Sequence, residues 1–123
     1  MRIDDPQLLT RVSEILKAMA DPTRLRILQA LMEAPKRVGT LVEEVGTTQA
    51  NVSKHLCLLK HAGLVAARRE GMGVEYRLAA PFVSEVCEVM CRGLVGQLAG
   101  GVRLHRNARR LVRRRAAARG ARS

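Results

Sequence analysis

Apolar residues recur at intervals of three and four along the first part of the chain, which is the spacing of amphipathic helices. Residues 8–20 carry one such stripe, formed by Leu8, Leu9, Val12, Ile15, Leu16 and Met19. A second pattern begins at Asp21-Pro22, an N-cap residue followed by a first-turn proline, and ends before Pro35. Residues 38–45 and 49–62 carry two more, with Gly46 between them at a position typical of a helix end. We therefore predict four consecutive helices.

The pattern changes from helical to extended after Gly63. Residues 64–69 and 74–78 indicate two strands around a Gly-containing loop at residues 70–73, which predicts a β-hairpin. A fifth helical pattern follows from Pro81 to Leu98, with one broad apolar face formed by Phe82, Val86, Val89, Met90, Leu94 and Leu98. The predicted fold is mainly α with a small β-hairpin. Two short helices joined by a Gly-bearing turn, with a hairpin directly after the second, are the parts of a winged helix-turn-helix.

Composition favours a single globular domain with an aliphatic core. Hydrophobic residues make up 47% of the 123 residues, but Trp is absent and Phe and Tyr occur once each. The sequence contains no run near the ~20 apolar residues that span a bilayer, and its start lacks the apolar centre of a signal peptide. We therefore expect a cytoplasmic protein that makes no use of a membrane.

Positive charge is concentrated at one end of the chain. The formal net charge is +11, yet residues 1–100 hold 13 Lys and Arg against 11 Asp and Glu, whereas residues 101–123 hold nine Arg and no acidic residue. We predict a DNA-binding and dimerisation domain at residues 1–100 and an Arg-rich C-terminal tail at residues 101–123. The tail fits both a basic amphipathic helix on DNA and a solvated extension. On DNA it would add affinity without sequence preference.

The helix at residues 49–62 begins with short polar and cationic side chains, which is what a helix needs in order to contact base edges in the major groove. The candidate contacts are Thr48, Gln49, Asn51, Ser53, Lys54 and His55. On the hairpin, Arg68, Arg69 and Arg77 are suited to flanking phosphates or to the minor groove. The predicted partner is double-stranded DNA. A helical hairpin with a solvated polar face is the alternative interpretation.

The chain resembles the ArsR/SmtB family of bacterial repressors in segments that cover about half of it. They are Ala20-Asp21-Pro22-Thr23-Arg24-Leu25-Arg26-Ile27-Leu28, the run from Asn51-Val52-Ser53-Lys54-His55-Leu56 to Gly63-Leu64-Val65, and Arg69-Glu70-Gly71 with Tyr76-Arg77-Leu78. The resemblance implies a homodimeric winged-helix repressor that binds a palindromic operator and leaves it when an inducer binds. It also implies dimerisation through the first and last body helices, in agreement with their apolar faces.

Two inducer sites of that family have no counterpart in this sequence. Many members bind thiophilic ions through a Cys-x-Cys run at the third helix, whereas Arg37-Val38-Gly39-Thr40-Leu41 contains no cysteine. Others bind zinc through Asp and His of the last helix, whereas residues 82–98 contain neither. If an inducer acts on this protein, its site must lie elsewhere.

The three cysteines are the remaining candidates for inducer sensing. Cys87 and Cys91 lie one helical turn apart, and Cys57 lies in the helix at residues 49–62. Cys87 and Cys91 are suited to a soft metal or metalloid ion, or to oxidation through a persulfide or an inter-protomer bond, because a disulfide within one helix is geometrically awkward. The Cys-x-x-x-Cys pattern also resembles a subgroup of the family with sulfur or redox associations. The alternative is that these cysteines are small core residues.

The remaining chemistry gives no sign of an enzyme. The sequence has no phosphate-cradling Gly-rich loop, no evident nucleophile with a nearby base and no paired carboxylates. His61 follows Cys57 by four residues and would share its face, which fits either a metal pair or a helix-end histidine that favours the helix dipole. Apart from a soft metal or metalloid ion, no cofactor is indicated. The alternative function is a nonspecific nucleic-acid-binding architectural protein driven by the Arg-rich tail.

Overall fold

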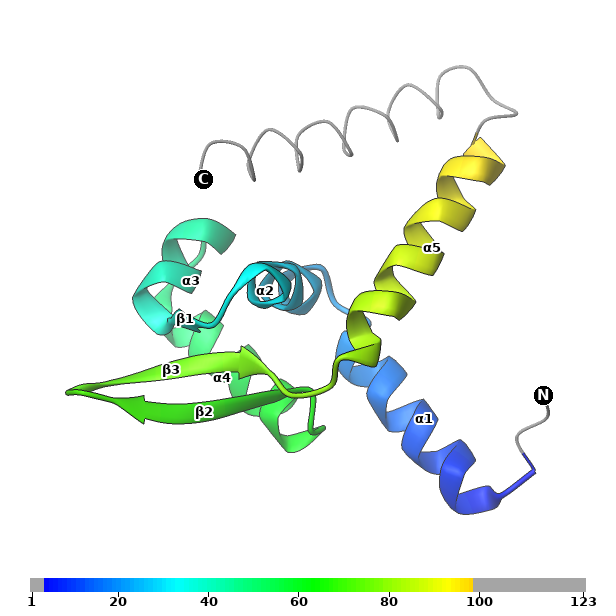
Figure 1. The fold of residues 1–123 in the computed structure, drawn as a ribbon, viewed down its shortest axis with the longest axis horizontal. Helices are drawn as coiled ribbons and strands as arrows, with labels where there is room; N and C mark the ends of the chain where they lie inside the picture. The colour runs from blue at the N-terminus through cyan, green and yellow to red at the C-terminus, as the bar shows by residue number, and fades with distance from the viewer. Residues whose placement is uncertain (1–3, 99–123) are drawn as a thin grey trace. The chain divides into compact units, whose positions relative to one another are not determined.

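The computed structural model describes residues 4–98, which are shown in colour in Figure 1. They form five helices and three strands: α1 (Pro6–Met19), α2 (Pro22–Glu33), β1 (Lys36–Arg37), α3 (Val38–Val45), α4 (Gln49–His61), β2 (Val65–Glu70), β3 (Gly73–Leu78) and α5 (Phe82–Leu98). The predicted order of four helices, a hairpin and a helix is confirmed. The predicted tail lies outside the described residues.

The chain divides into two compact units between Val83 and Ser84. The first unit contains α1 to α4 and all three strands, and the second contains most of α5. The candidate contacts with DNA belong to the first unit, whereas Cys87 and Cys91 belong to the second.

Side-chain caps fix the starts of three helices. The side chains of Asp5, Asp21 and Thr48 accept hydrogen bonds from the backbone N–H groups of Gln7, Arg24 and Asn51, at 3.0, 3.0 and 3.1 Å respectively. Such a cap satisfies a helix N–H that has no partner within the helix, and its loss typically costs about 1 kcal/mol. α1, α2 and α4 therefore each begin at the residue that follows the capping residue.

The sheet has one strand more than the sequence predicts. Its order is β1-β3-β2, with both neighbouring pairs antiparallel. β1 consists of two residues, Lys36 and Arg37, which pair with Tyr76 and Glu75 of β3. A strand this short shows no alternation of apolar and polar side chains, so no pattern in the sequence indicates it. β1 pairs with the middle of β3 and ties the hairpin to the start of α3.

The hairpin loop is shorter than the four residues predicted. β2 and β3 pair from Val65 opposite Leu78 to Glu70 opposite Gly73, which leaves Gly71 and Met72 as the turn. Gly71 has a φ of 60°, the left-handed conformation that two-residue hairpin turns require. The prediction failed because Glu70 and Gly73 were assigned to the loop, whereas Glu70 ends β2 and Gly73 begins β3.

The core of the first unit is aliphatic, as predicted from the composition. Its large side chains come mainly from α2, α3 and α4, which pack on one another. The largest fully buried residues of this unit are Ile27, Leu28, Leu41, Val52, Leu56, Leu59, Leu64 and Val83. One face of α4 is therefore fully occupied by the core.

α1 and α5 each expose large apolar side chains. On α1, Leu8, Leu9 and Leu16 are about half exposed. On α5, the exposed residues include Val89, Met90 and Leu94. Within residues 4–98, no helix has the length and apolar character needed to cross a membrane.

Candidate nucleic-acid interface

α3, the turn at residues 46–48 and α4 form the helix-turn-helix. Gly46 ends α3 with a left-handed φ of 78°, and its N–H donates to the Val42 carbonyl at 2.9 Å. Thr48 caps α4 by accepting from the N–H of Asn51, and the Asn51 side-chain amide donates to the Thr47 hydroxyl at 3.1 Å. Side-chain bonds at both threonines therefore set the direction in which α4 leaves the turn.

The exposed side of α4 begins with a stripe of small and polar side chains, and continues beyond it with Leu58, Lys60 and His61. The stripe consists of Gln49, Ala50, Ser53, Lys54 and Cys57. These positions are neighbours on a helix surface because they are separated by one, three or four residues. An amide, a hydroxyl and an ammonium group are suited to base edges and phosphates, and an exposed methyl group is suited to the thymine methyl. Ala50 was not predicted, because an alanine carries no hydrogen-bonding signal.

Two of the predicted contact residues also build the turn. Asn51 is half-buried and its amide is bonded to Thr47, so only part of its hydrogen-bonding capacity remains for a base. Thr48 is exposed and accepts the capping bond through its oxygen, which leaves its hydroxyl hydrogen able to donate to a phosphate. Their contact with DNA stays a prediction.

His55 lies on the inner side of α4, contrary to the prediction that it faces DNA. It is only 9% exposed, and its Nδ1 lies 3.2 Å from Nη1 of Arg24. Because a guanidinium can only donate, Nδ1 is the acceptor in this contact. The physical reason is helical spacing: position 55 follows Val52 by three residues and precedes Leu59 by four, so it shares their buried face. We remove His55 from the candidate contacts.

Arg24 joins α1, α2 and α4 at this point. From the first turn of α2, its Nε donates to the Ala18 carbonyl at 2.6 Å and its Nη2 to the Lys17 carbonyl at 3.4 Å, both near the end of α1. Its third contact is with His55 of α4. The network therefore holds α4, which is the recognition helix of the helix-turn-helix, against α1 and α2.

Asp21 completes this network at the start of α2. The backbone N–H of Arg24 donates to the Asp21 carboxylate, and this bond holds the pKa of Asp21 below its usual value although partial burial opposes the effect. The same carboxylate lies 4.0 Å from Nδ1 of His55. Asp21 is therefore ionised at neutral pH and serves both as a cap and as a negative charge beside Arg24.

The pleat of the hairpin separates the three predicted arginines. Strand pairing places Arg68 opposite Glu75 and Arg69 opposite Val74, so Arg68 and Arg69 point to opposite faces of the sheet. Arg77, opposite Ala66, shares the face of Arg68. All three side chains are exposed. They surround the hairpin with positive charge but do not form one cluster.

Acidic groups partly neutralise the face that carries Arg68. The Arg68 guanidinium forms an ion pair with Glu70, with Nη2–Oε2 and Nε–Oε2 distances of 2.7 and 3.1 Å. On the opposite face, Arg69 lies near the tip of the hairpin. Of the two arginines in β2, Arg69 is therefore the better placed for a phosphate, since Arg68 would have to leave Glu70.

Arg37 in β1 positions the hairpin tip and was not predicted. Its Nη2 donates to the Glu70 carbonyl at 2.7 Å, and its guanidinium lies where a side chain on Gly73 would stand. Gly73 therefore permits the close approach of this guanidinium and does not have a positive φ. No pattern in the sequence indicates this contact, because the acceptor is a backbone carbonyl.

The cysteines are present as thiols. Cys57 is exposed on α4, four residues before the exposed His61, whereas on α5 Cys87 is buried and Cys91 is half-buried. Within residues 4–98, no group of three or more His, Cys, Asp and Glu side chains is placed to hold a metal ion. A metal bound by these residues would need two-coordinate geometry or ligands from outside this set.

Comparison with known proteins supports a regulatory function. The family model described as "Bacterial regulatory protein, arsR family" matches residues 21–67, which include α2, the helix-turn-helix and the start of β2. The HTH-type transcriptional regulator Rv0081 of Mycobacterium tuberculosis is 42% identical over 78 residues, 63% of this chain and 68% of the relative. The repressor SmtB of the same organism is 41% identical over 73 residues, 59% of this chain and 54% of the relative.

Solved structures agree with the sequence comparison. The crystal structure of Rv0081 has a TM-score of 0.70 and 38% identity, and the match covers 80% of this chain and 99% of that chain. The winged helix-turn-helix domain of Mb0332 from Mycobacterium bovis, described as homodimeric, has a TM-score of 0.66 and 30% identity, with coverage of 80% and 93%.

These findings confirm the predicted winged helix-turn-helix and the prediction that the chain is not an enzyme. They do not favour the alternative of a nonspecific architectural protein, because the relatives are transcriptional regulators and repressors. Together with the exposed stripe on α4, they lead to one conclusion. The chain belongs to the ArsR family of bacterial regulatory proteins and is a DNA-binding transcriptional regulator.

Proposed function

We propose that this regulator is a homodimeric repressor that binds a palindromic operator in the cytoplasm and releases it when its thiols receive a signal. The exposed stripe of α4 carries the proposal, since Gln49, Ser53 and Lys54 offer different chemistry on one accessible helix face. A side-chain amide can bond adenine bidentately, while a lysine suits guanine or a phosphate. Thr48, Asn51 and the arginines of the hairpin contact the flanking backbone.

The test of DNA recognition compares two duplexes of equal length, the intergenic DNA upstream of the gene and a random sequence. Fluorescence anisotropy should give at least about a thousandfold tighter binding to the intergenic duplex. Gln49→Ala should weaken that binding by about 5- to 100-fold and relax preference at one base pair of each half-site. Lys54→Ala should lower the slope of log affinity against log salt by about one. Lys17→Ala in α1 is the matched control and should change neither quantity.

Equal affinity for both duplexes would contradict operator recognition. If that binding also vanished on removal of residues 101–123, the Arg-rich tail would be the DNA-binding element. In our proposal the tail, with nine Arg and no acidic residue, only adds affinity to an operator complex that residues 1–100 form without it.

A second copy of the chain covers the apolar residues of α1 and α5. Leu8, Leu9 and Leu16 on α1 and Val89, Met90 and Leu94 on α5 are each about half exposed, and large apolar side chains clustered on a helix face mark a surface for a partner. The homodimeric state of Mb0332 supports this choice of partner. Two copies related by a two-fold axis would also match a palindromic operator.

Analytical ultracentrifugation tests the dimer. Leu16→Lys should shift the protein toward a monomer, because a charge would have to be buried at the interface. Met72→Lys is the control, since Met72 is fully exposed at the hairpin turn. A dimer of unchanged dissociation constant in Leu16→Lys would exclude α1 from the interface.

The thiols of Cys87, Cys91 and Cys57 receive the inducing signal. A soft metal or metalloid ion would bind Cys87 and Cys91 as thiolates. Alternatively, two thiols give two electrons and two protons to a disulfide or polysulfide oxidant and become joined through sulfur. Either change alters α5 and, in the dimer, its contact with the second copy.

The inducer test adds cadmium, arsenite or polysulfide to the operator complex. The double variant Cys87→Ser, Cys91→Ser should bind the operator as the native protein does but should no longer release it. Cys57→Ser separates a direct effect at the DNA-facing thiol from an effect at α5. Normal release from the double variant would exclude the α5 pair as the sensor.

A further inference from the structure

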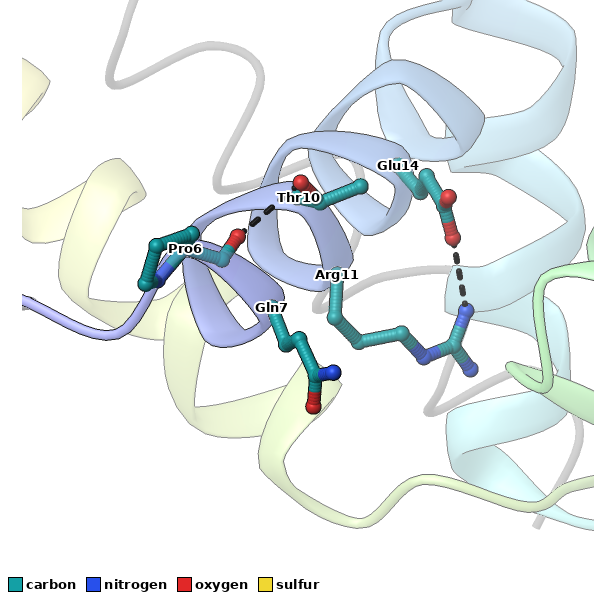
Figure 2. A pocket seen from close by; sticks show the side chains of 5 residues that line it. All are labelled: Pro6, Gln7, Thr10, Arg11 and Glu14. Carbon is teal, nitrogen blue, oxygen red and sulfur yellow. Dashed lines mark hydrogen bonds and ion pairs between the residues drawn. The ribbon is translucent and has the colours of Figure 1, made fainter.

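Arg11 of α1 reaches the end of the recognition helix. Its Nη2 donates to the Ala62 carbonyl at 2.7 Å, across 51 positions of sequence, while its Nη1 lies 3.4 Å from the Glu14 carboxylate. Figure 2 shows this side chain beside Gln7, with its guanidinium turned toward Glu14, in a pocket lined by the first turns of α1. Arg11 therefore connects two helices that the sequence pattern does not relate.

The acceptor lies where α4 has free carbonyl groups. Ala62 is the C-cap residue of α4, and the chain reverses at Gly63, whose φ is 80°. The last carbonyls of a helix have no partner within it and form the negative end of the helix dipole. A guanidinium at this place both donates a hydrogen bond and adds a favourable positive charge.

Gly63 has no side chain at the place where Arg11 approaches the end of α4. A Cβ atom at Gly63 would stand 2.9 Å from Nη2 of Arg11, closer than side-chain atoms normally approach. The glycine is required by its positive φ, and its lack of a side chain leaves the guanidinium the space that it occupies. The short hydrogen bond to the Ala62 carbonyl makes the Arg11 contact part of the local architecture.

We infer that Arg11 is a positioning residue for DNA recognition, which fixes the C-terminal end of α4 to α1. The inference rests on the proposed function, because α1 also carries Leu8, Leu9 and Leu16, which we assign to contact with a second copy. Arg11 thereby sets the angle of the recognition helix relative to the helix that dimerises. Without this bond the C-terminal end of α4 would be less restrained than its core-facing and Arg24-bound parts, and DNA binding would have to restrict it.

The test measures DNA binding and local exchange for Arg11→Gln, Arg11→Lys and Glu14→Gln. Arg11→Gln should weaken operator binding by about tenfold, since one charge-assisted hydrogen bond to the helix end is lost. Arg11→Lys should recover part of that loss, because an ammonium group can still donate to Ala62. Glu14→Gln is the matched control, since it removes the ion pair but leaves the bond to Ala62.

Two readouts separate positioning from other roles. In Arg11→Gln, the salt slope of operator binding and the dimer dissociation constant should stay unchanged. Backbone amides in the last turn of α4 should exchange hydrogen faster than in the native protein, a measurement that needs no DNA. A salt slope lowered by one would make Arg11 a phosphate contact, and a monomeric variant would make it an interface residue. Either result, or unchanged exchange and affinity, would overturn the inference.

The same series distinguishes this inference from the proposed function. If the native protein shows no preference for the intergenic duplex, operator recognition fails, yet exchange at the end of α4 still decides whether Arg11 fixes the helix. If the native protein selects the operator and Arg11→Gln behaves like Glu14→Gln, operator recognition stands and the role of Arg11 is refuted.

Discussion

Replacement of Arg24 by methionine tests the bonds that hold the recognition helix against α1 and α2. The guanidinium donates to the Ala18 carbonyl at 2.6 Å and to Nδ1 of His55 at 3.2 Å. Methionine keeps an apolar stem of similar length but its side chain has no N–H group, so these two acceptors and the more exposed Lys17 carbonyl lose their donor. We expect the variant to fold in the same way with a lower free energy of unfolding.

The magnitude follows from the burial of each acceptor. His55 is 9% exposed, so an unpaired Nδ1 should cost about 1–3 kcal/mol. Ala18 is half-buried, and because water can replace part of its bond the cost there should be about 0.5–1.5 kcal/mol. The two costs together lower the free energy of unfolding by about 1.5–4.5 kcal/mol. In a domain of this size a loss in that range lowers Tm by about 6 °C or more.

Urea unfolding followed by circular dichroism measures this loss, at one fixed protein concentration because the stability of a dimer depends on concentration. Arg26→Met is the control, since Arg26 is an exposed arginine of the same helix. A double variant, Arg24→Met with His55→Leu, removes both partners. Its loss in free energy of unfolding should be smaller than the summed losses of the two single variants by at least about 1 kcal/mol. Equal midpoints for Arg24→Met and Arg26→Met, or the absence of any coupling, would refute the reasoning.

Further predictions concern the glycines and Asp21. Gly39→Ala should stabilise the protein by about 0.5 kcal/mol because Gly39 lies within α3, whereas Gly46→Ala should destabilise it by about 1–2 kcal/mol because the φ of Gly46 is 78°. Among the described residues, an added Cβ meets no atom within 4 Å at either site, so thermal unfolding would report backbone effects alone. Gly73→Ala should cost about 1 kcal/mol by displacing the Arg37 guanidinium from the Glu70 carbonyl, and an Arg37→Ala background that leaves this cost unchanged would disprove the cause. Because the pKa of Asp21 is lowered, its carboxylate stabilises the fold fully above about pH 3.8, and this stabilisation is lost as the pH falls further. If the capping bond is the cause, acid titration of Asp21→Asn should show a smaller loss of stability below that pH than titration of the native protein.

The sequence predicted the elements of this fold because each long element repeats a pattern. α3 was predicted with its observed bounds, since Leu41 and Val45 mark the buried face and Gly46 ends the helix. β1 was missed because two residues cannot show a repeat. The observed ends of some helices differ slightly from the predicted ones, because capping residues and not the apolar pattern decide where the first and last turns lie.

The candidate site was predicted less completely than the fold. His55 was assigned to the DNA-facing side from its polar type, although its spacing from Val52 and Leu59 indicates the buried face. The bonds of Arg11 and Arg37 end on backbone carbonyls, which every residue carries and which leave no mark in a sequence. Their acceptors become known only when the chain is folded.

The two attachments of α4 have a consequence for changing the target sequence of this regulator. The attachments engage the His55 ring and the Ala62 carbonyl, whereas the exposed stripe begins at Gln49 and has no part in either. Side chains of the stripe can therefore be exchanged for those of another regulator without loosening the helix. A graft of all of α4 would replace His55 as well and leave Arg24 without its acceptor. New specificity should therefore be transferred as a set of surface side chains, with the anchoring residues retained.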